Sequence, residues 1–198
     1  MSTEKLTQEE IDRMMSELTQ APVAASTTIS QMESDIIGEV GNISMSQAAT
    51  TLSEILGHKV HITTPQVFVK SIREVIDAAV KPKIITSIGF KKGLTGNNLL
   101  LMDAQDSVII ANLMMGGDGQ VTSSELTELE LSAVGEAMNQ MMGSSATAMA
   151  TMLGKMIDIL PPEVHLVDDK ENLGVDIGIG NLHSDVCLIA FQLEVEGI

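Results

Sequence analysis

Residues 35–67, DIIGEVGNISMSQAATTLSEILGHKVHITTPQV, recur later in the chain as residues 132–164, SAVGEAMNQMMGSSATAMATMLGKMIDILPPEV. An offset of 97 residues aligns the two stretches without a gap and makes eleven positions identical. Chance would give roughly two or three identities, and self-similarity at a fixed offset is the mark of a duplicated structural unit. The sequence therefore predicts two related halves, about residues 30–118 and 119–198. The identical pairs are Gly38/Gly135, Glu39/Glu136, Asn42/Asn139, Met45/Met142, Ala49/Ala146, Thr50/Thr147, Leu56/Leu153, Gly57/Gly154, Ile62/Ile159, Pro65/Pro162 and Val67/Val164.

Each copy opens with a stretch that predicts a long helix rich in small residues. The first helix can begin near Ser30, with Glu33 at capping-box spacing, and end at Gly57. The second can begin near Ser124 and end at Gly154. Glycines inside these helices each cost about 1 kcal/mol relative to alanine, so we expect another part of the backbone to approach closely there. These glycines are Gly38, Gly41, Gly135 and Gly143.

Strand-like runs follow each helix, and a further helix over about residues 104–115 bridges the halves. We predict an α+β fold with pseudo-two-fold symmetry, in which two long motif-bearing helices lie against an antiparallel sheet. The expected strands lie near residues 67–69, 84–90, 99–102, 164–167, 175–179 and 186–191.

Composition and charge narrow the function classes. The chain has 198 residues, 44% of them hydrophobic, which suffices for a buried core. A net charge of -16 argues against binding to nucleic acid or an anionic membrane, because both need clustered Lys and Arg. A single cysteine, Cys187, allows no internal disulfide, and we find neither a signal peptide nor a membrane-spanning stretch. We expect a cytoplasmic protein whose partner is another protein.

The N-terminal region predicts a short helix on a tether. Over residues 6–18, Thr7 and Glu10 have capping-box spacing, and apolar residues recur on one helical stripe. Residues 19–29 are small, polar and contain proline, which favours a flexible linker. A globular domain would then occupy residues 30–198.

The two copies also share a polar pattern. Spacings of i, i+4 and i+7 place the polar residues on one face of each helix, and a proline follows 22 residues after each asparagine. One such stripe alone is typical of a solvated helix face. Two copies in register, each with its proline, favour function. The sets are Asp35, Glu39, Asn42 and Pro65, and Ser132, Glu136, Asn139 and Pro162.

In these residues the chain resembles the CheC, CheX and FliY family of CheY-phosphate phosphatases, whose motif is Asp or Ser, x3, Glu, x2, Asn, x22, Pro. Both copies satisfy the motif, and the resemblance extends from about Ser30 onward. It implies that the glutamates, Glu39 and Glu136, contact the active-site Lys of the regulator CheY. It also implies that the asparagines, Asn42 and Asn139, enter the regulator's acidic pocket and orient a water in line with its aspartyl phosphate.

Elementary chemistry agrees with such a role. A neutral amide can position an attacking water, as glutamine does in GTPases, without repelling the phosphoryl group. The sequence shows no phosphate-binding loop, no Arg cluster beside either motif and no residue set spaced for a metal. We therefore expect no cofactor in this chain, and Mg²⁺ supplied by the partner CheY.

The N-terminal segment, residues 1–18, is expected to bind CheY and distinguishes branches of the family. It resembles the peptide with which FliM and FliY recruit phosphorylated CheY, and it favours the FliY branch. We then expect flagellar switch partners of the FliM, FliG and FliN types and a place at the cytoplasmic face of the flagellar basal body. Members of this branch normally carry a further C-terminal domain of the FliN type. The residues that resemble the recruiting peptide are Leu6, Thr7, Gln8, Glu9, Glu10, Ile11 and Asp12.

An alternative class stays open. The middle domain of FliM has the same duplicated fold, so the chain could be a non-catalytic rotor scaffold that binds CheY. Intact Glu and Asn in both copies favour the enzyme. Other polar residues favour structural roles: His58 and His61 lack further metal ligands nearby, and Asp103 and Asp106 are expected to cap the bridging helix.

Overall fold

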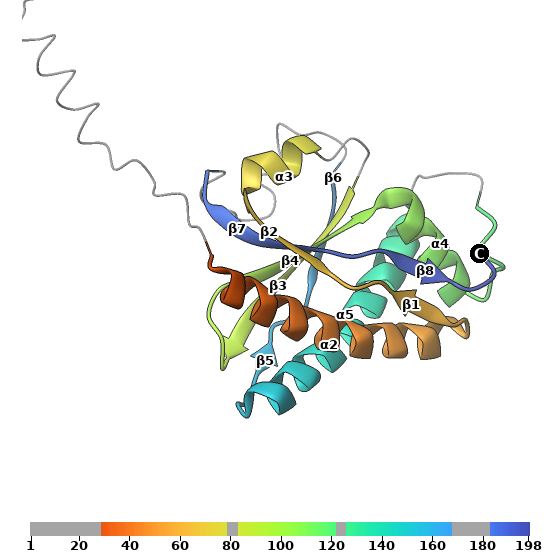
Figure 1. Ribbon diagram of the computed structural model, residues 1–198. Coiled ribbons are helices and arrows are strands. Elements are labelled where there is room, and N and C mark those ends of the chain that lie inside the picture. Colours follow the sequence, from red (N-terminus) through yellow and green to blue (C-terminus); the bar gives the residue numbers. More distant parts are fainter. Residues whose placement is uncertain (1–28, 79–82, 122–125, 168–182) are drawn as a thin grey trace, which may run out of the picture.

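The computed structural model describes residues 29–78, 83–121, 126–167 and 183–198 (Figure 1). The predicted helix of residues 6–18, most of the linker and the strand expected near 175–179 lie outside these ranges. In chain order the elements are α2 (Gln31–Leu56), β1 (Val60–Ile62), β2 (Gln66–Ser71), α3 (Ile72–Ala78), β3 (Lys83–Lys92), β4 (Asn97–Asp103), α4 (Ala104–Met114), α5 (Glu128–Leu153), β5 (Asp158–Ile159), β6 (Glu163–Val167), β7 (Asp185–Ala190) and β8 (Leu193–Val195).

The first long helix has the predicted ends. The Ser30 hydroxyl accepts from the Glu33 backbone N–H, and a Glu33 carboxylate oxygen accepts from the Ser30 N–H at 2.8 Å, which completes a capping box. Gly57 ends α2 in the left-handed conformation, with φ of 66°. Glycine is the residue that adopts this conformation at least cost.

The second long helix begins later than predicted. Its N-cap is Thr127, not Ser124, and Glu130 completes the capping box by accepting from the Thr127 N–H at 2.7 Å. The residue three positions after Ser124 is Thr127, which lacks the carboxylate that such a box needs. The predicted end at Gly154 is confirmed, with φ of 61°.

Strands from the two halves pair with one another, and all of these pairs are antiparallel. Strand β1 pairs with β8, β2 with β7, and β3 with both β5 and β6, while β3 and β4 form a hairpin within the first half. The predicted α+β fold with a duplicated unit is thus confirmed. The described strands form separate sheets and not one continuous sheet.

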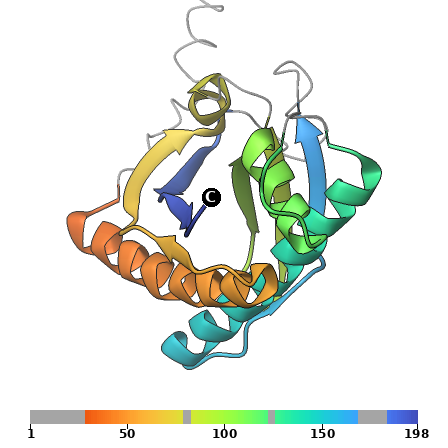
Figure 2. The same ribbon diagram turned by 90° about the vertical axis from the view of Figure 1, so that its right-hand side faces the viewer.

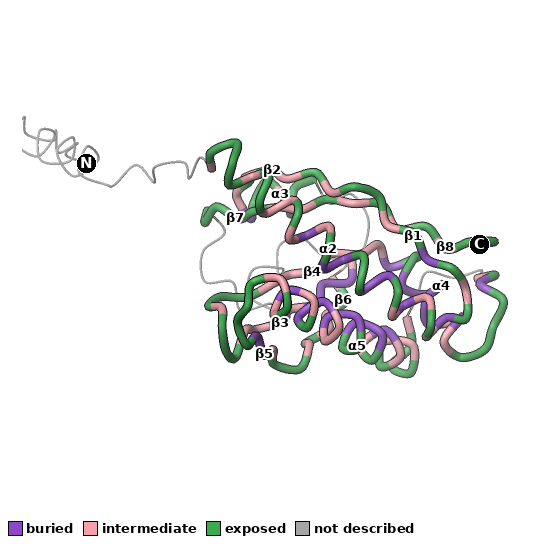
Figure 3. The backbone as a smooth tube through the Cα atoms, turned by 60° about the horizontal axis from the view of Figure 1, so that its bottom comes forward, coloured by how far each residue is buried: buried purple, intermediate pink, exposed green. Residues whose placement is uncertain are grey.

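The two long helices pack against each other along one side of the molecule, with the strands standing over them (Figure 2). In Figure 1, α2 runs from left to right and α5 from upper right to lower left, so their directions are roughly opposed. The largest core cluster joins the second half of α2 to the first half of α5, together with β3 and α4. Figure 3 shows buried residues gathered around α5, α4 and β3, whereas β2 and β7 carry no buried residue.

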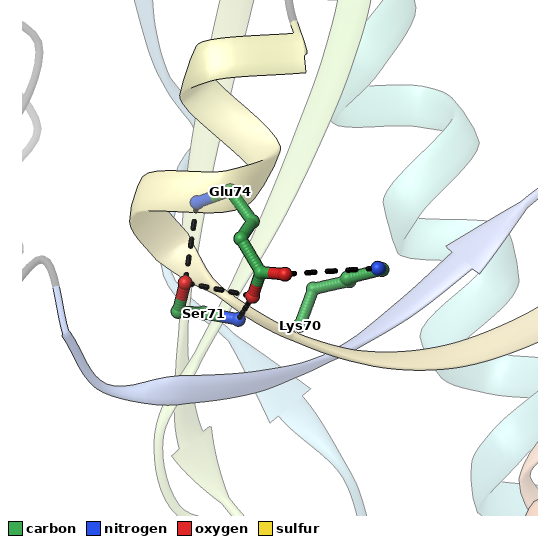
Figure 4. A network of polar contacts seen from close by, with 3 residues as sticks. All are labelled: Lys70, Ser71 and Glu74. Atoms are coloured by element: carbon green, nitrogen blue, oxygen red, sulfur yellow. Dashed lines mark hydrogen bonds and ion pairs between the residues drawn. The ribbon is translucent and has the colours of Figure 1, made fainter.

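The shortest helix and strands were not predicted from the sequence. Helix α3 and strands β1, β5 and β8 are too short to display a period. Helix α3 follows a capping arrangement in which Glu74 accepts from both the backbone N–H and the hydroxyl of Ser71 at 2.9 Å, with Lys70 at 3.7 Å (Figure 4). The Ser71 hydrogen bonds hold the pKa of Glu74 below its usual value.

Candidate functional site

The first motif lies on the first half of α2, where its side chains face solvent. Asp35 and Glu39 are exposed and Asn42 is half-buried. The Gln31 amide donates to Asp35 Oδ1 at 2.8 Å. Neither Glu39 nor Asn42 has a side-chain hydrogen bond within the described part of the chain, so both are available to a partner.

The second motif lies on the first half of α5 and differs in its contacts. Ser132, Glu136 and Asn139 are all exposed. The Gln140 amide donates to Glu136 Oε1 at 2.7 Å, and the Ser132 hydroxyl donates to the Glu128 carbonyl at 2.9 Å. The motif glutamate is therefore engaged by its own helix on α5 but not on α2.

The motif prolines sit at the entrances of β2 and β6. Pro65 and Pro162 each precede the first residue of a strand, a position where the missing N–H removes no ladder hydrogen bond. Two residues beyond each proline a valine packs on the motif helix: a Cβ added at Gly38 would lie 3.4 Å from Val67 Cγ2.

The second copy repeats this contact between Gly135 and Val164, at 3.5 Å. These glycines directly precede the motif glutamates, so the small residue lets a strand side chain rest on the helix beside the site. The expected close approach thus comes from a side chain and not from a backbone. It is absent at Gly143, where an added Cβ would meet nothing within 4 Å of the described atoms.

The two motifs lie at separate places on the helix pair. Each occupies the first half of its helix, and the helices run in roughly opposite directions (Figure 1). The sites therefore lie toward opposite ends of the pair. The two motifs therefore form two separate surface sites and not one composite pocket.

The inner faces of the two motif segments differ. A cavity of about 580 Å³ lies against the first half of α2, on the side away from the motif; its lining includes Ile37, Val40 and Gly41. The corresponding face of the first half of α5 is buried, and Val134 and Met138 are at most 1% exposed there.

The motif residues have no cationic partner within the described ranges. The ion pairs found there lie elsewhere, such as Arg73 with Asp77 and Lys91 with Asp158. The described residues also contain no group of three His, Cys, Asp or Glu placed to hold a metal ion. Two carboxylates on α2 and one on α5 make the sites negative. The described residues near the motifs can orient water and bind a cation, but they offer no charge that would stabilise a phosphoryl group.

Other candidate residues have structural surroundings. Asp103 occupies the N-cap position of α4 as expected, but its side chain makes no cap hydrogen bond and pairs with Lys83 on β3 instead. The expectation that Asp103 caps by its side chain was therefore wrong, because a strand lysine lies within reach. The His58 ring lies 3.4 Å from the Glu196 carbonyl, and His61 is exposed on β1.

A family model described as the CheC-like family matches residues 32–69 and 129–166, the two segments that carry the motifs. The crystal structure of Thermotoga maritima FliY is 42% identical, has a TM-score of 0.79 and covers 87% of each chain. The chain belongs to the CheC-like family.

Two relatives carry functional names. The flagellar motor switch phosphatase FliY of Bacillus subtilis is 45% identical over 180 residues, which are 89% of this chain and 48% of the relative. The CheY-P phosphatase CheX of Thermotoga maritima is 35% identical over 81 residues, or 41% of this chain and 50% of the relative. The chain thus spans about half the length of these CheC-like relatives.

The fold also occurs in FliM. The crystal structure of the FliM middle domain from H. pylori has a TM-score of 0.66 at 13% identity and covers 85% of this chain and 88% of the other. At this identity the likeness concerns the fold alone. Among the described residues, no helix of this CheC-like chain is both long and apolar enough to cross a membrane.

Proposed function

We propose that this chain is a protein aspartyl-phosphate phosphatase that dephosphorylates phosphorylated CheY. The observation that carries the proposal is the presence of two solvent-facing Glu/Asn pairs at matching positions of two related helices. The names of the relatives, a motor switch phosphatase and a CheY-P phosphatase, support the same activity.

The asparagines act on water. Asn42 and Asn139 project from the two long helices, their side chains make no hydrogen bond within the described structure, and both are free to enter a partner's acidic pocket. There the amide oxygen accepts from the attacking water and holds it in line with the scissile bond. Positioning of this kind lowers the barrier without any covalent step on this chain.

The glutamates act on the regulator. Each lies one turn before its asparagine on the same face, so a lysine that contacts Glu39 or Glu136 fixes the regulator's orientation relative to Asn42 or Asn139. Charge on the phosphoryl oxygens is then balanced by the regulator's own Lys and by Mg²⁺ that the regulator carries. This division follows from the lack of cations beside the motifs in the described structure.

The proposal extends to place and partners. The N-terminal segment from Leu6 to Asp12 would recruit phosphorylated CheY, and residues 19–29 would tether it to the domain. As in a motor switch protein, FliM-, FliG- and FliN-type proteins would be neighbours at the cytoplasmic face of the flagellar basal body. The similarity to motor switch FliY supports this placement.

A non-catalytic scaffold resembling FliM is the second candidate, because the same fold occurs there at low identity. A scaffold gives no reason for Glu and Asn side chains that reach the surface at matching positions of both helices. The phosphatase therefore accounts for more of the observed surface.

The deciding experiment compares substrates in matched Mg²⁺ and EDTA series. The purified chain should accelerate phosphate release from phosphorylated CheY and should hydrolyse neither p-nitrophenyl phosphate nor acetyl phosphate. EDTA should stop the first reaction without removing metal from this chain. Vigorous Mg²⁺-dependent hydrolysis of the small esters by the chain alone would contradict the shared-site mechanism, and no effect on phosphorylated CheY would favour the scaffold.

A further inference from the structure

Exposed apolar side chains lie beside the motif on α2. At 3.6 residues per turn, Glu39 and Asn42 lie within about 40° of Asp35 around the helix axis. Three large apolar residues lie about 60° to 100° from Asp35, on one flank of the motif. They are Met32, Ile36 and Ile43, which are 73%, 57% and 39% exposed.

The equivalent flank of α5 has a different chemistry. Met32 corresponds to Leu129, Ile36 to Ala133 and Ile43 to Gln140 under the same offset of 97 residues. Leu129 is 69% exposed, but the other two positions offer a methyl group and an amide. The apolar flank is therefore extensive on α2 and reduced to one large side chain on α5.

Gln140 has a second consequence for α5. Its amide holds Glu136 Oε1 at 2.7 Å, whereas the equivalent Ile43 can donate nothing to Glu39. A lysine that approaches Glu136 must compete with this hydrogen bond. Glu39 meets no such competition within the described structure.

We propose that the two sites differ in affinity: the α2 site binds the phosphorylated regulator more tightly through Met32, Ile36 and Ile43, while Gln140 weakens binding at the α5 site by occupying Glu136. This inference rests on the proposed phosphatase activity. The occupant is the regulator because a surface that brings a pocket over Asn42 and a lysine to Glu39 must also cover the adjacent flank. Burial of apolar area on this flank of α2 adds affinity. The flank of α5 that carries an amide lacks this contribution.

Single-site proteins isolate the two affinities. Asn139→Ala leaves only the α2 site and Asn42→Ala leaves only the α5 site. In steady-state phosphate release from phosphorylated CheY, we expect the KM of the α2-only protein to be lower by about five- to tenfold, a range that a few buried methyl groups supply. Equal KM values, or a lower KM for the α5-only protein, would overturn the inference.

Exchange of the paired residues tests the cause. Ile43→Gln in the α2-only protein should raise KM severalfold, and Gln140→Ile in the α5-only protein should lower it, both with little change in kcat. Gln140→Ala frees Glu136 without adding a large apolar group, so it should lower KM by less than Gln140→Ile. A change confined to kcat, or no change in KM from either exchange, would contradict the assignment of these residues.

Control variants distinguish a failure of this inference from a failure of the proposed phosphatase activity. Glu54→Gln, an exposed change on the second half of α2, should leave KM unaltered in the α2-only protein. If Ile36→Ser changed the oligomeric state in sedimentation, the flank would be an interface between two copies of this chain and the inference would fail. Undiminished release by the variant without both asparagines would instead refute the proposed activity itself.

Discussion

The first half of α2 and the first half of α5 present related motifs to solvent but rest on different interiors. Beneath α5, Val134, Ala137 and Met138 are fully buried, and α4 packs against the helix. Beneath α2, Ile37 and Val40 are only half-buried and line a cavity. The motif glutamate and asparagine are the same on both helices, while the packing beneath them differs. Both copies share the contact between a strand valine and the motif helix, although the interiors below them differ.

Loss of both asparagines should have the largest effect. Asn42→Ala and Asn139→Ala should each reduce turnover of phosphorylated CheY partially, and together they should lower it by about 100-fold or more, because no positioned water remains. Circular dichroism should show an unchanged fold, since both side chains are outside the core. Full activity in the double variant would show that the two motifs are alike in sequence but do not carry the activity.

The packing difference predicts unequal costs of truncation. Met138→Ala should lower the free energy of unfolding by about 2–4 kcal/mol, because it opens a void in a tightly packed core. Ile37→Ala should cost less than about 2 kcal/mol, because its side chain borders an existing cavity. Urea denaturation measures both. Equal costs would show that the α2 interior is packed as well as that of α5.

One glycine on each long helix extends the comparison of α2 and α5 to smaller effects on stability. Gly143→Ala should stabilise the protein by about 0.5–1 kcal/mol, since alanine favours the helix and nothing among the described atoms lies within 4 Å of the new methyl group. Gly38→Ala should stabilise the protein by less. Val67 Cγ2 lies 3.4 Å from the added Cβ, so the new methyl group meets a side chain that already packs on α2. Thermal denaturation of the two variants provides the test. A destabilised Gly143→Ala protein would contradict the open surroundings.

The capping boxes should give the smallest effect, and the same one on both helices. Hydrogen bonds from the backbone N–H and then the hydroxyl of Ser30 lower the pKa of Glu33 from 4.5, and Thr127 does the same for Glu130. A lowered folded-state pKa means that the stabilisation is complete above about pH 4.5 and is lost as the pH falls through the folded value.

The test is the urea midpoint between pH 6 and pH 3. Glu33→Gln and Glu130→Gln should each reduce the fall in the midpoint over this range. A variant with the same pH dependence as the unaltered chain would show that its box does not contribute. A marked difference between the two variants would distinguish the helix ends.

The features that could be predicted from the sequence are those that depend on local pattern. The offset of 97 residues predicted the duplicated fold, and small and polar residues at Ser30, Gly57 and Gly154 marked three of the four long-helix ends correctly. Pairing across the halves was not predictable, because strand register depends on which surfaces meet in three dimensions. Likewise, only the structure showed that Gln140 holds Glu136 and that Asp103 faces Lys83. The roles of the motif residues themselves stay predictions until the variants are measured.

The pairing of strands across the two halves also affects when the chain can fold during synthesis. Val60 of β1 pairs with Val195 of β8, so the ribosome must add 135 residues before the first strand meets its partner. At typical elongation rates this interval is on the order of ten seconds, during which β1 and β2 lack their partner strands. The first half of the chain, expressed alone, would therefore lack the strands with which β1 and β2 pair.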